Sequence, residues 1–293
     1  MTVLVGYLAG KSSRAPLQLA VAAARTLKTS LTVATIVPKP WAFPSPAKVD
    51  GEFAAWADQV AADSGREAQR ELEALGVPVE VQYLSHAHRS VSGGMIEVAN
   101  EVGAELLVLG SSSNGQLGQV VLGSSADRLL HSSPIPVLIA PRGYRNPRGG
   151  ILTRITCGYP GTPEAVDLVR RVEAIAQRLE IPMRVAVFAV LGRTMYPPEV
   201  SLHAEEAVLT EWEKQAAETL AQLRTDGVVG EDVLLQVVSG HDWGEALDDA
   251  EWEDGEILAL GTSPRVGIAQ VVLGTRGSKI MRVSPVPVLV LPG

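Results

Sequence analysis

Short, wholly apolar runs alternate with amphipathic stretches along the chain. The first run, Val3–Val5, is apolar at every position, which is typical of a strand buried on both faces of a sheet. After it, apolar residues recur at the spacing of one helix face, at Leu17, Ala20, Val21, Ala24 and Leu27. This change from a strand pattern to a helix pattern predicts an α/β protein whose parallel strands are joined by helices.

The same alternation continues to about residue 141. It predicts four more strands, over Leu31–Val37, Val79–Leu84, Glu105–Gly110 and Val137–Ala140. It predicts further helices over Glu52–Leu75, Met95–Val102 and Gly123–Ser132. Five strands with helical crossovers form a parallel sheet that carries helices on both faces.

A repeat then divides the chain into two domains. Residues 119–141 align without gaps to residues 270–292, and 11 of the 23 positions are identical. A repeat period of about one domain indicates a tandem duplication rather than a solenoid. Between the copies, residues 142–150 are rich in Gly, Pro and Arg and lack hydrophobic periodicity, as expected of a linker. We therefore expect one domain over 1–141, a linker over 142–150 and a second domain over 151–293.

Composition indicates the cellular compartment and the kinds of partner to expect. The chain is 46% apolar and 20% charged, an ordinary globular balance. It has no apolar run of about 18–20 residues, and its first residues lack the basic region of a secretory signal. Cys157 is the single cysteine, so no intrachain disulfide can form. These features predict a cytoplasmic protein with no membrane partner.

The charge is unevenly distributed between the halves. The formal net charge is −8, and residues 151–293 carry 12 Lys and Arg against 21 Asp and Glu. Duplex nucleic acid needs a basic face, because binding neutralises phosphates. The acidic second half therefore argues against a nucleic-acid partner.

The segment between the fourth strand and the next helix is the most specific candidate for chemistry. In the first half it reads Gly110-Ser111-Ser112-Ser113, nine residues, then Gly123-Ser124; in the second it reads Gly261-Thr262-Ser263-Pro264, nine residues, then Gly274-Thr275. A glycine after a strand lets the backbone approach a ligand closely, and a Gly-Ser or Gly-Thr helix start offers N–H groups to a phosphate. The same residues also serve as a plain strand exit and helix start, and the sequence chemistry leaves both interpretations open.

Both segments resemble the universal stress protein family, whose members carry Gly-x-x-Gly, nine residues, Gly-Ser/Thr, a helix and a Pro-Val-Leu-Val-type final strand. The resemblance covers nearly the whole chain. It implies two tandem α/β domains, each with a five-stranded parallel sheet, paired pseudo-symmetrically through the final strands Val137–Ala140 and Val288–Leu291. Members of the family dimerise readily, so the resemblance also implies a homodimer of whole chains.

The resemblance further implies an adenine nucleotide, ATP foremost, at the carboxyl ends of the strands. The corresponding residues are Ile36, Gly110, Ser111, Ser113, Gly123, Ser124 and Ser125 in the first half, and Gly261, Thr262, Gly274 and Thr275 in the second. The acidic residue that ATP-binding members place after the first strand is replaced by Leu8 and by Pro160, and the second glycine of the motif is replaced by Ser113 and by Pro264. Proline also lacks the N–H donor. We therefore expect a degenerate cleft that is better preserved in the first half.

These features favour a non-catalytic stress-response regulatory or binding module. The alternatives are a protein-interaction scaffold that acts without nucleotide, and a weak nucleotide hydrolase. The sequence has no Gly-x-x-x-x-Gly-Lys-Ser/Thr, Gly-x-Ser-x-Gly or His-Glu-x-x-His motif. His86 and His88 lie two residues apart without further Cys or His nearby, so we interpret them as a solvated pair in the loop after the third strand and expect no metal site.

Overall fold

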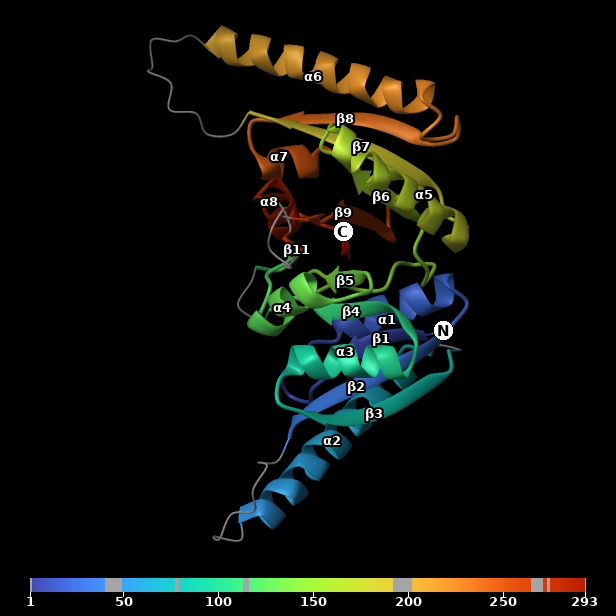
Figure 1. Ribbon diagram of the computed structural model, residues 1–293, viewed down its shortest axis with the longest axis vertical. Coiled ribbons are helices and arrows are strands. Elements are labelled where there is room, and N and C mark those ends of the chain that lie inside the picture. Colours follow the sequence, from blue (N-terminus) through green and yellow to red (C-terminus); the bar gives the residue numbers. More distant parts are fainter. Residues whose placement is uncertain are drawn as a thin grey trace.

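The computed structural model describes residues 2–39, 49–76, 79–112, 116–191, 202–264, 271–272 and 275–292. Ten strands form one sheet in the order β3-β2-β1-β4-β5-β12-β9-β6-β7-β8. Figure 1 shows the first half in the lower part of the molecule and the second half above it, with the sheet passing from one to the other. Each half contributes five mutually parallel strands, which confirms the predicted fold class.

The first half follows the predicted order of elements. They are β1 (Thr2–Gly6), α1 (Ala15–Thr26), β2 (Ser30–Pro38), α2 (Val49–Ala74), β3 (Val81–His88), α3 (Val91–Glu101), β4 (Ala104–Gly110), α4 (Ser124–Ser132) and β5 (Val137–Ala140). His86 and His88 lie within β3, so the prediction that they follow the third strand was wrong. The strand runs past Leu84 because β2 extends to Pro38 and pairs with β3 as far as His88.

The second half repeats this order. Its elements are β6 (Arg154–Gly158), η1 (Pro163–Ala165), α5 (Val166–Leu179), β7 (Met183–Val190), α6 (Leu202–Thr225), β8 (Leu234–Gly240), α7 (Trp243–Asp248), β9 (Glu256–Gly261), α8 (Thr275–Val283) and β12 (Val288–Leu291). Two short strands, β10 (Ser263–Pro264) and β11 (Val271–Val272), pair antiparallel after β9.

The halves join through their last strands. β5 and β12 pair antiparallel, with Leu138 opposite Leu289. This pairing gives the pseudo-symmetric arrangement that the family resemblance implied. Because the two central strands run in opposite directions, the carboxyl edge of the first half lies beside the amino edge of the second. That juxtaposition places elements of both halves at the same end of the sheet.

Two apolar clusters fill the two faces of the sheet. On one face α1, α2, α5 and α6 pack on a cluster that includes Val3, Leu138, Ile155 and Leu289, so it continues across the junction. On the other face α3, α4, α7 and α8 pack on a cluster that also combines residues of both halves. None of the helices within the described residues is long and apolar enough to cross a membrane.

Polar contacts also cross the junction. The Lys28 ammonium lies 2.7 Å from a carboxylate oxygen of Glu180, and Arg178 pairs with Glu105. The backbone N–H of Leu152 donates to the Thr26 hydroxyl, which is buried, at 2.8 Å. Shared core and shared hydrogen bonds hold the two halves as one packed unit.

Candidate functional site

The candidate cleft of the first half lies where β1 and β4 end and α4 begins. Gly110 is the last residue of β4 and packs against α1: a Cβ at this position would lie 3.1 Å from Cγ of Pro16. The equivalent Gly261 ends β9, and its Cβ would lie 3.0 Å from Cδ2 of Leu168 in α5. Close packing against the first helix of each half therefore accounts for both strand-exit glycines.

Gly123 is different, because packing does not explain it. Apart from its neighbours in the chain, no atom of the described residues lies within 4 Å of the position that its Cβ would occupy. Its φ of −79° is open to any residue, so the backbone does not require glycine either. The first N–H groups of any helix lack an intrahelical partner, and Gly123, the N-cap of α4, makes no side-chain bond to them. The space in front of this helix end is open to a ligand atom.

The two serines that follow Gly123 differ in solvent exposure. Ser124 is exposed and Ser125 is half-buried at the start of α4, where both can face an anion. Asp127 places a carboxylate in the same first turn and opposes negative charge there. At this helix start the dipole and the Asp127 carboxylate therefore act on an anion in opposite directions.

Ser111 is tied into the fold. Its hydroxyl oxygen accepts a hydrogen bond from the Val121 N–H at 2.6 Å and donates toward the carbonyl oxygens of Val121 at 3.1 Å and Gln119 at 3.2 Å. The Ser112 N–H also donates to the Val121 carbonyl, at 2.6 Å. These bonds fold residues 119–121 back onto the end of β4. Ser113 lies outside the described residues.

The turn after β1 is closed by its own side chains. The Leu8 N–H donates to the Ser12 hydroxyl at 2.9 Å, and the Ser12 N–H donates to the Leu8 carbonyl at 2.8 Å. Leu8 is half-buried, as is Ile36, which lies near the end of β2 and packs on the apolar cluster of α3 and α4. The structure thus gathers the ends of β1, β2 and β4 on one edge of the sheet.

In the corresponding segment of the second half, more of the polar groups are used in hydrogen bonds within the protein. The Thr262 hydroxyl and N–H both donate to the Leu291 carbonyl, at 3.1 and 3.2 Å. Pro264 lies in β10 and faces Val271 of β11. Thr275 is the first residue of α8, whereas Gly274 lies outside the described residues. The pairing of β10 with β11 corresponds in position to the Ser112–Val121 hydrogen bond of the first half.

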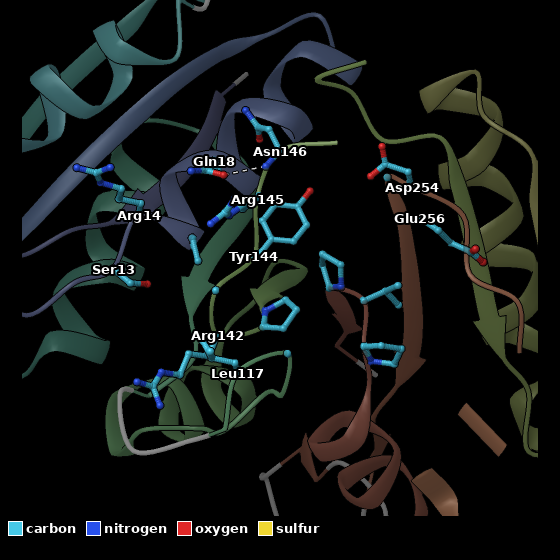
Figure 2. Close-up of a pocket in the computed structure, with 18 of the residues that line it drawn as sticks. Ser13, Arg14, Gln18, Leu117, Arg142, Tyr144, Arg145, Asn146, Asp254 and Glu256 are labelled. Atoms are coloured by element: carbon cyan, nitrogen blue, oxygen red, sulfur yellow. Dashed lines mark hydrogen bonds between the residues drawn. The ribbon is translucent and has the colours of Figure 1, made fainter. Parts of the chain in front are cut away.

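A cavity of about 1030 Å³ lies elsewhere, between the two halves. Figure 2 shows Ser13, Arg14 and Gln18 on one side of it, together with Tyr144 and Arg145 of the linker, and Asp254 on the opposite side. None of the residues that we predicted for the nucleotide site is among those that line it. Its residues come from five separate segments, 13–18, 117–118, 141–146, 253–256 and 285–287, and the sequence analysis did not predict it.

The histidine pair of β3 contacts a carboxylate. His86 Nε2 lies 2.8 Å from Oε2 of Glu97 in α3, and His88 Nε2 lies 3.5 Å from Oε1. The hydrogen bond with His86 lowers the pKa of the Glu97 carboxyl below its usual value. No group of three or more His, Cys, Asp or Glu suited to a metal occurs within the described ranges.

A buried charged cluster lies inside the second half, on β6, β7 and β9, and was not predicted. Arg184 and Glu256 are each 1% exposed, and a guanidinium nitrogen of Arg184 lies 2.7 Å from the Glu256 carboxylate. Arg184 also donates to the Thr156 hydroxyl and lies 4.9 Å from the centre of the Trp252 ring. Desolvation lowers the pKa of Arg184. Glu256 is the last residue of the acidic stretch Asp242–Glu256, whose composition indicates a solvent-exposed surface. The Arg184–Glu256 ion pair is therefore seen only in the structure.

Comparisons with known proteins identify the family. The family model described as the universal stress protein family matches residues 1–141 and again residues 152–292. A universal stress protein of Mycobacterium tuberculosis is 58% identical over 293 residues, which is 100% of both chains. A universal stress protein structure from Archaeoglobus fulgidus aligns over 99% of this chain and 98% of its own, with a TM-score of 0.59 and 15% identity, and so shares the fold.

Smaller structures match about half of the chain. One universal stress protein from Archaeoglobus fulgidus was solved in complex with dAMP (18% identity, TM-score 0.31) and another universal stress protein in complex with cAMP (26% identity, TM-score 0.33). They cover 48% of this chain and 97% and 96% of their own, and a likeness this low carries no inference about the ligand of the present protein. On the two family matches and the 58% identical relative, the chain belongs to the universal stress protein family.

Proposed function

We propose that this tandem universal stress protein is a non-catalytic binding module whose first half holds an adenine nucleotide weakly, while its second half serves mainly as a folding and pairing partner. The observation that carries the proposal is Gly123. It stands at the uncapped start of α4, and neither packing nor its backbone conformation requires a glycine there. A phosphate fits such a helix end because free N–H groups and the positive end of the helix dipole face it.

The contacts of the first half also argue for weak binding. Leu8 stands where nucleotide-binding members carry an acidic residue, so a ribose or base contact is missing. The Ser111 hydroxyl is engaged by Val121 and Gln119, and it would have to break those bonds to reach a ligand. The adjacent Asp127 repels a polyanion.

The second half supports the proposed asymmetry. Pro264 supplies no N–H at the position that would face a phosphate, and a hydrogen bond to a charged group is worth about 1.5–3 kcal/mol. The Thr262 hydroxyl and N–H both donate to the Leu291 carbonyl of β12. The polar groups of this segment therefore hold the half together rather than face a ligand.

One observation favours the alternative of a nucleotide-independent interaction scaffold. The bonds of Ser111 and Ser112 to residues 119–121 satisfy the first-half loop without any ligand. A protein whose loop is already satisfied gains less from binding a phosphate. This alternative and the proposal differ in whether nucleotide binds at all.

The test is calorimetric binding of ATP, ADP and AMP to the full chain and to two matched variants, Gly123→Glu and Gly274→Glu. The glutamate at 123 has room and an ordinary backbone conformation, so the variant should fold. It places a carboxylate where the phosphate would lie, so we expect Gly123→Glu to weaken binding by roughly tenfold or more and Gly274→Glu to leave it nearly unchanged. Circular dichroism of each variant checks the fold.

Two results would overturn the proposal. Absence of binding by the unaltered protein, together with no nucleotide released from freshly purified and denatured protein, would favour the scaffold. Loss of binding in Gly274→Glu, with none in Gly123→Glu, would place the site in the second half.

A further inference from the structure

We propose a second binding site in the cavity between the two halves, which takes a small organic anion: a phosphate or carboxylate group on a planar or apolar body. This second site shares no residue with the proposed nucleotide cleft. Its volume of about 1030 Å³ stands at the upper end of the roughly 300–1,000 Å³ that is usual for small-molecule sites. It exists because β5 and β12 bring the two halves together.

One wall of the cavity is cationic. It is formed by the start of α1 and by the linker, which contribute Arg14, Arg142 and Arg145. Figure 2 shows these three side chains spread along the same side of the cavity. The linker segment 142–148 carries three arginines and no acidic residue. Clustered guanidinium groups bind phosphate or carboxylate through paired N–H donors.

Two of these arginines, Arg14 and Arg145, retain capacity for a ligand. Arg145 is exposed and has no ion-pair partner among the residues that the structure describes. Arg14 pairs with Glu71 at 2.7 Å, but its side chain is 74% exposed, so this pair is a weak surface contact. The start of α1 adds partial positive charge, because its first turn has no acidic residue and no side-chain cap.

Two of the three acidic residues of the opposite wall pair with arginines of the second half. Glu253 pairs with Arg154 at 2.5 Å, and Glu256 pairs with Arg154 and Arg184, both at 2.7 Å. The third, Asp254, accepts a hydrogen bond from the backbone N–H of Arg148 at 2.9 Å and keeps its negative charge. An anion is therefore favoured beside the arginine wall, away from Asp254.

The remaining lining suits a planar or apolar body. It consists of the Tyr144 ring together with Leu117, Pro141, Pro285, Val286 and Pro287. Tyr144 Oη and Asn146 Oδ1 are buried at this wall and have no hydrogen-bond partner in the described part of the chain. Because these two atoms are closed off from solvent, the lining offers a ligand apolar contact rather than hydrogen bonds from them. An aromatic or otherwise flat ligand gains contact with the proline and tyrosine faces while its anionic group reaches the arginines.

The experiment measures binding of phenyl phosphate, benzoate and inorganic phosphate to the full chain by calorimetry and ligand-observed NMR. The variants are Arg145→Ala, the double variant Arg14→Ala/Arg145→Ala, and two controls. Arg70→Ala removes an exposed arginine of α2 that lies outside the cavity. Gly123→Glu blocks the proposed nucleotide cleft and leaves the cavity unaltered.

We expect phenyl phosphate or benzoate to bind more tightly than inorganic phosphate, because the ion lacks the apolar body. The better of the two organic probes identifies the anionic group. Arg145→Ala should weaken its binding by roughly tenfold, the double variant further, and added salt should weaken it in the unaltered protein. Arg70→Ala and Gly123→Glu should bind as the unaltered protein does.

The inference fails if no organic anion binds, if inorganic phosphate binds as well as the organic probes, or if Arg145→Ala and the double variant bind unchanged. It also fails if Gly123→Glu abolishes binding, because the probe would then occupy the nucleotide cleft. Failure of the nucleotide proposal, by contrast, shows as absent ATP binding with probe binding retained.

Discussion

The two halves share one topology but use polar chemistry in different places. In the first half Leu4 of β1 pairs with Thr32 of β2, and both residues are buried. In the second half the equivalent pair is Thr156 and Arg184, and both contact the buried carboxylate of Glu256. In the second half, buried charged groups thus link neighbouring strands. The first half keeps an unfilled space in front of Gly123 at its carboxyl edge. The comparison teaches that the two copies of a duplicated domain can keep one fold while only one of them holds its strands with a buried ion pair.

The largest expected effect comes from breaking the buried ion pair. Glu256→Ala should lower the free energy of unfolding by about 3–5 kcal/mol, because it leaves the Arg184 guanidinium buried without its carboxylate partner. The matched control is Glu105→Ala at the equivalent position of the first half. Glu105 is partly exposed and pairs with Arg178 at the surface, so its loss should cost about 1 kcal/mol or less. Urea unfolding of both variants measures the difference, and equal costs would contradict the comparison.

A smaller effect separates the glycines by their role. Gly110→Ala should destabilise the protein by about 1–3 kcal/mol, because the new methyl group meets the rigid Pro16 ring at 3.1 Å. Gly261→Ala meets the flexible Leu168 side chain and should cost less. Gly123→Ala should change stability by no more than about 0.5 kcal/mol, because the site is open and its φ is ordinary. Thermal unfolding ranks the three variants, and a large cost at Gly123 would show that the fold itself needs this glycine.

The smallest effect concerns Cys157 in β6, whose strand equivalent in the first half is Val5. Burial raises the pKa of the Cys157 thiol to about 12, so the thiolate is scarce at any pH at which the protein is handled. Iodoacetamide at pH 8–9 should leave the folded protein unmodified and alkylate it fully once it is unfolded, as mass spectrometry would record. Cys157→Val should change stability by less than about 1 kcal/mol, because a buried thiol acts as a small apolar group. Rapid alkylation of the folded protein would show that this strand is accessible.

Sequence patterns predicted the parts of the fold that depend on local apolar spacing. The last strand of the first half was predicted over Val137–Ala140 and is β5 with the same bounds. The end of β3 was missed because Ser85, His86 and His88 make the last half of this edge strand polar, so its pattern resembles a loop. The pairing of β5 with β12 followed from the family resemblance and not from either strand alone.

The site was less predictable than the fold. A motif marks Gly110 and Gly123 equally, yet Gly110 is explained by Pro16 and Gly123 by no protein contact. That distinction depends on what surrounds each glycine, which spacing does not encode. The Arg184–Glu256 pair was hidden because charged residues in a sequence usually indicate exposure. The interdomain cavity depends on segments more than 100 residues apart, such as Arg14 and Asp254.

The most direct test of the division between the halves is a crystal structure of the protein soaked with ATP. The account predicts phosphate density beside Gly123 and Ser124 at the start of α4 and none beside Gly274 and Thr275. Density at Gly274 and Thr275 with none at Gly123 and Ser124 would contradict it.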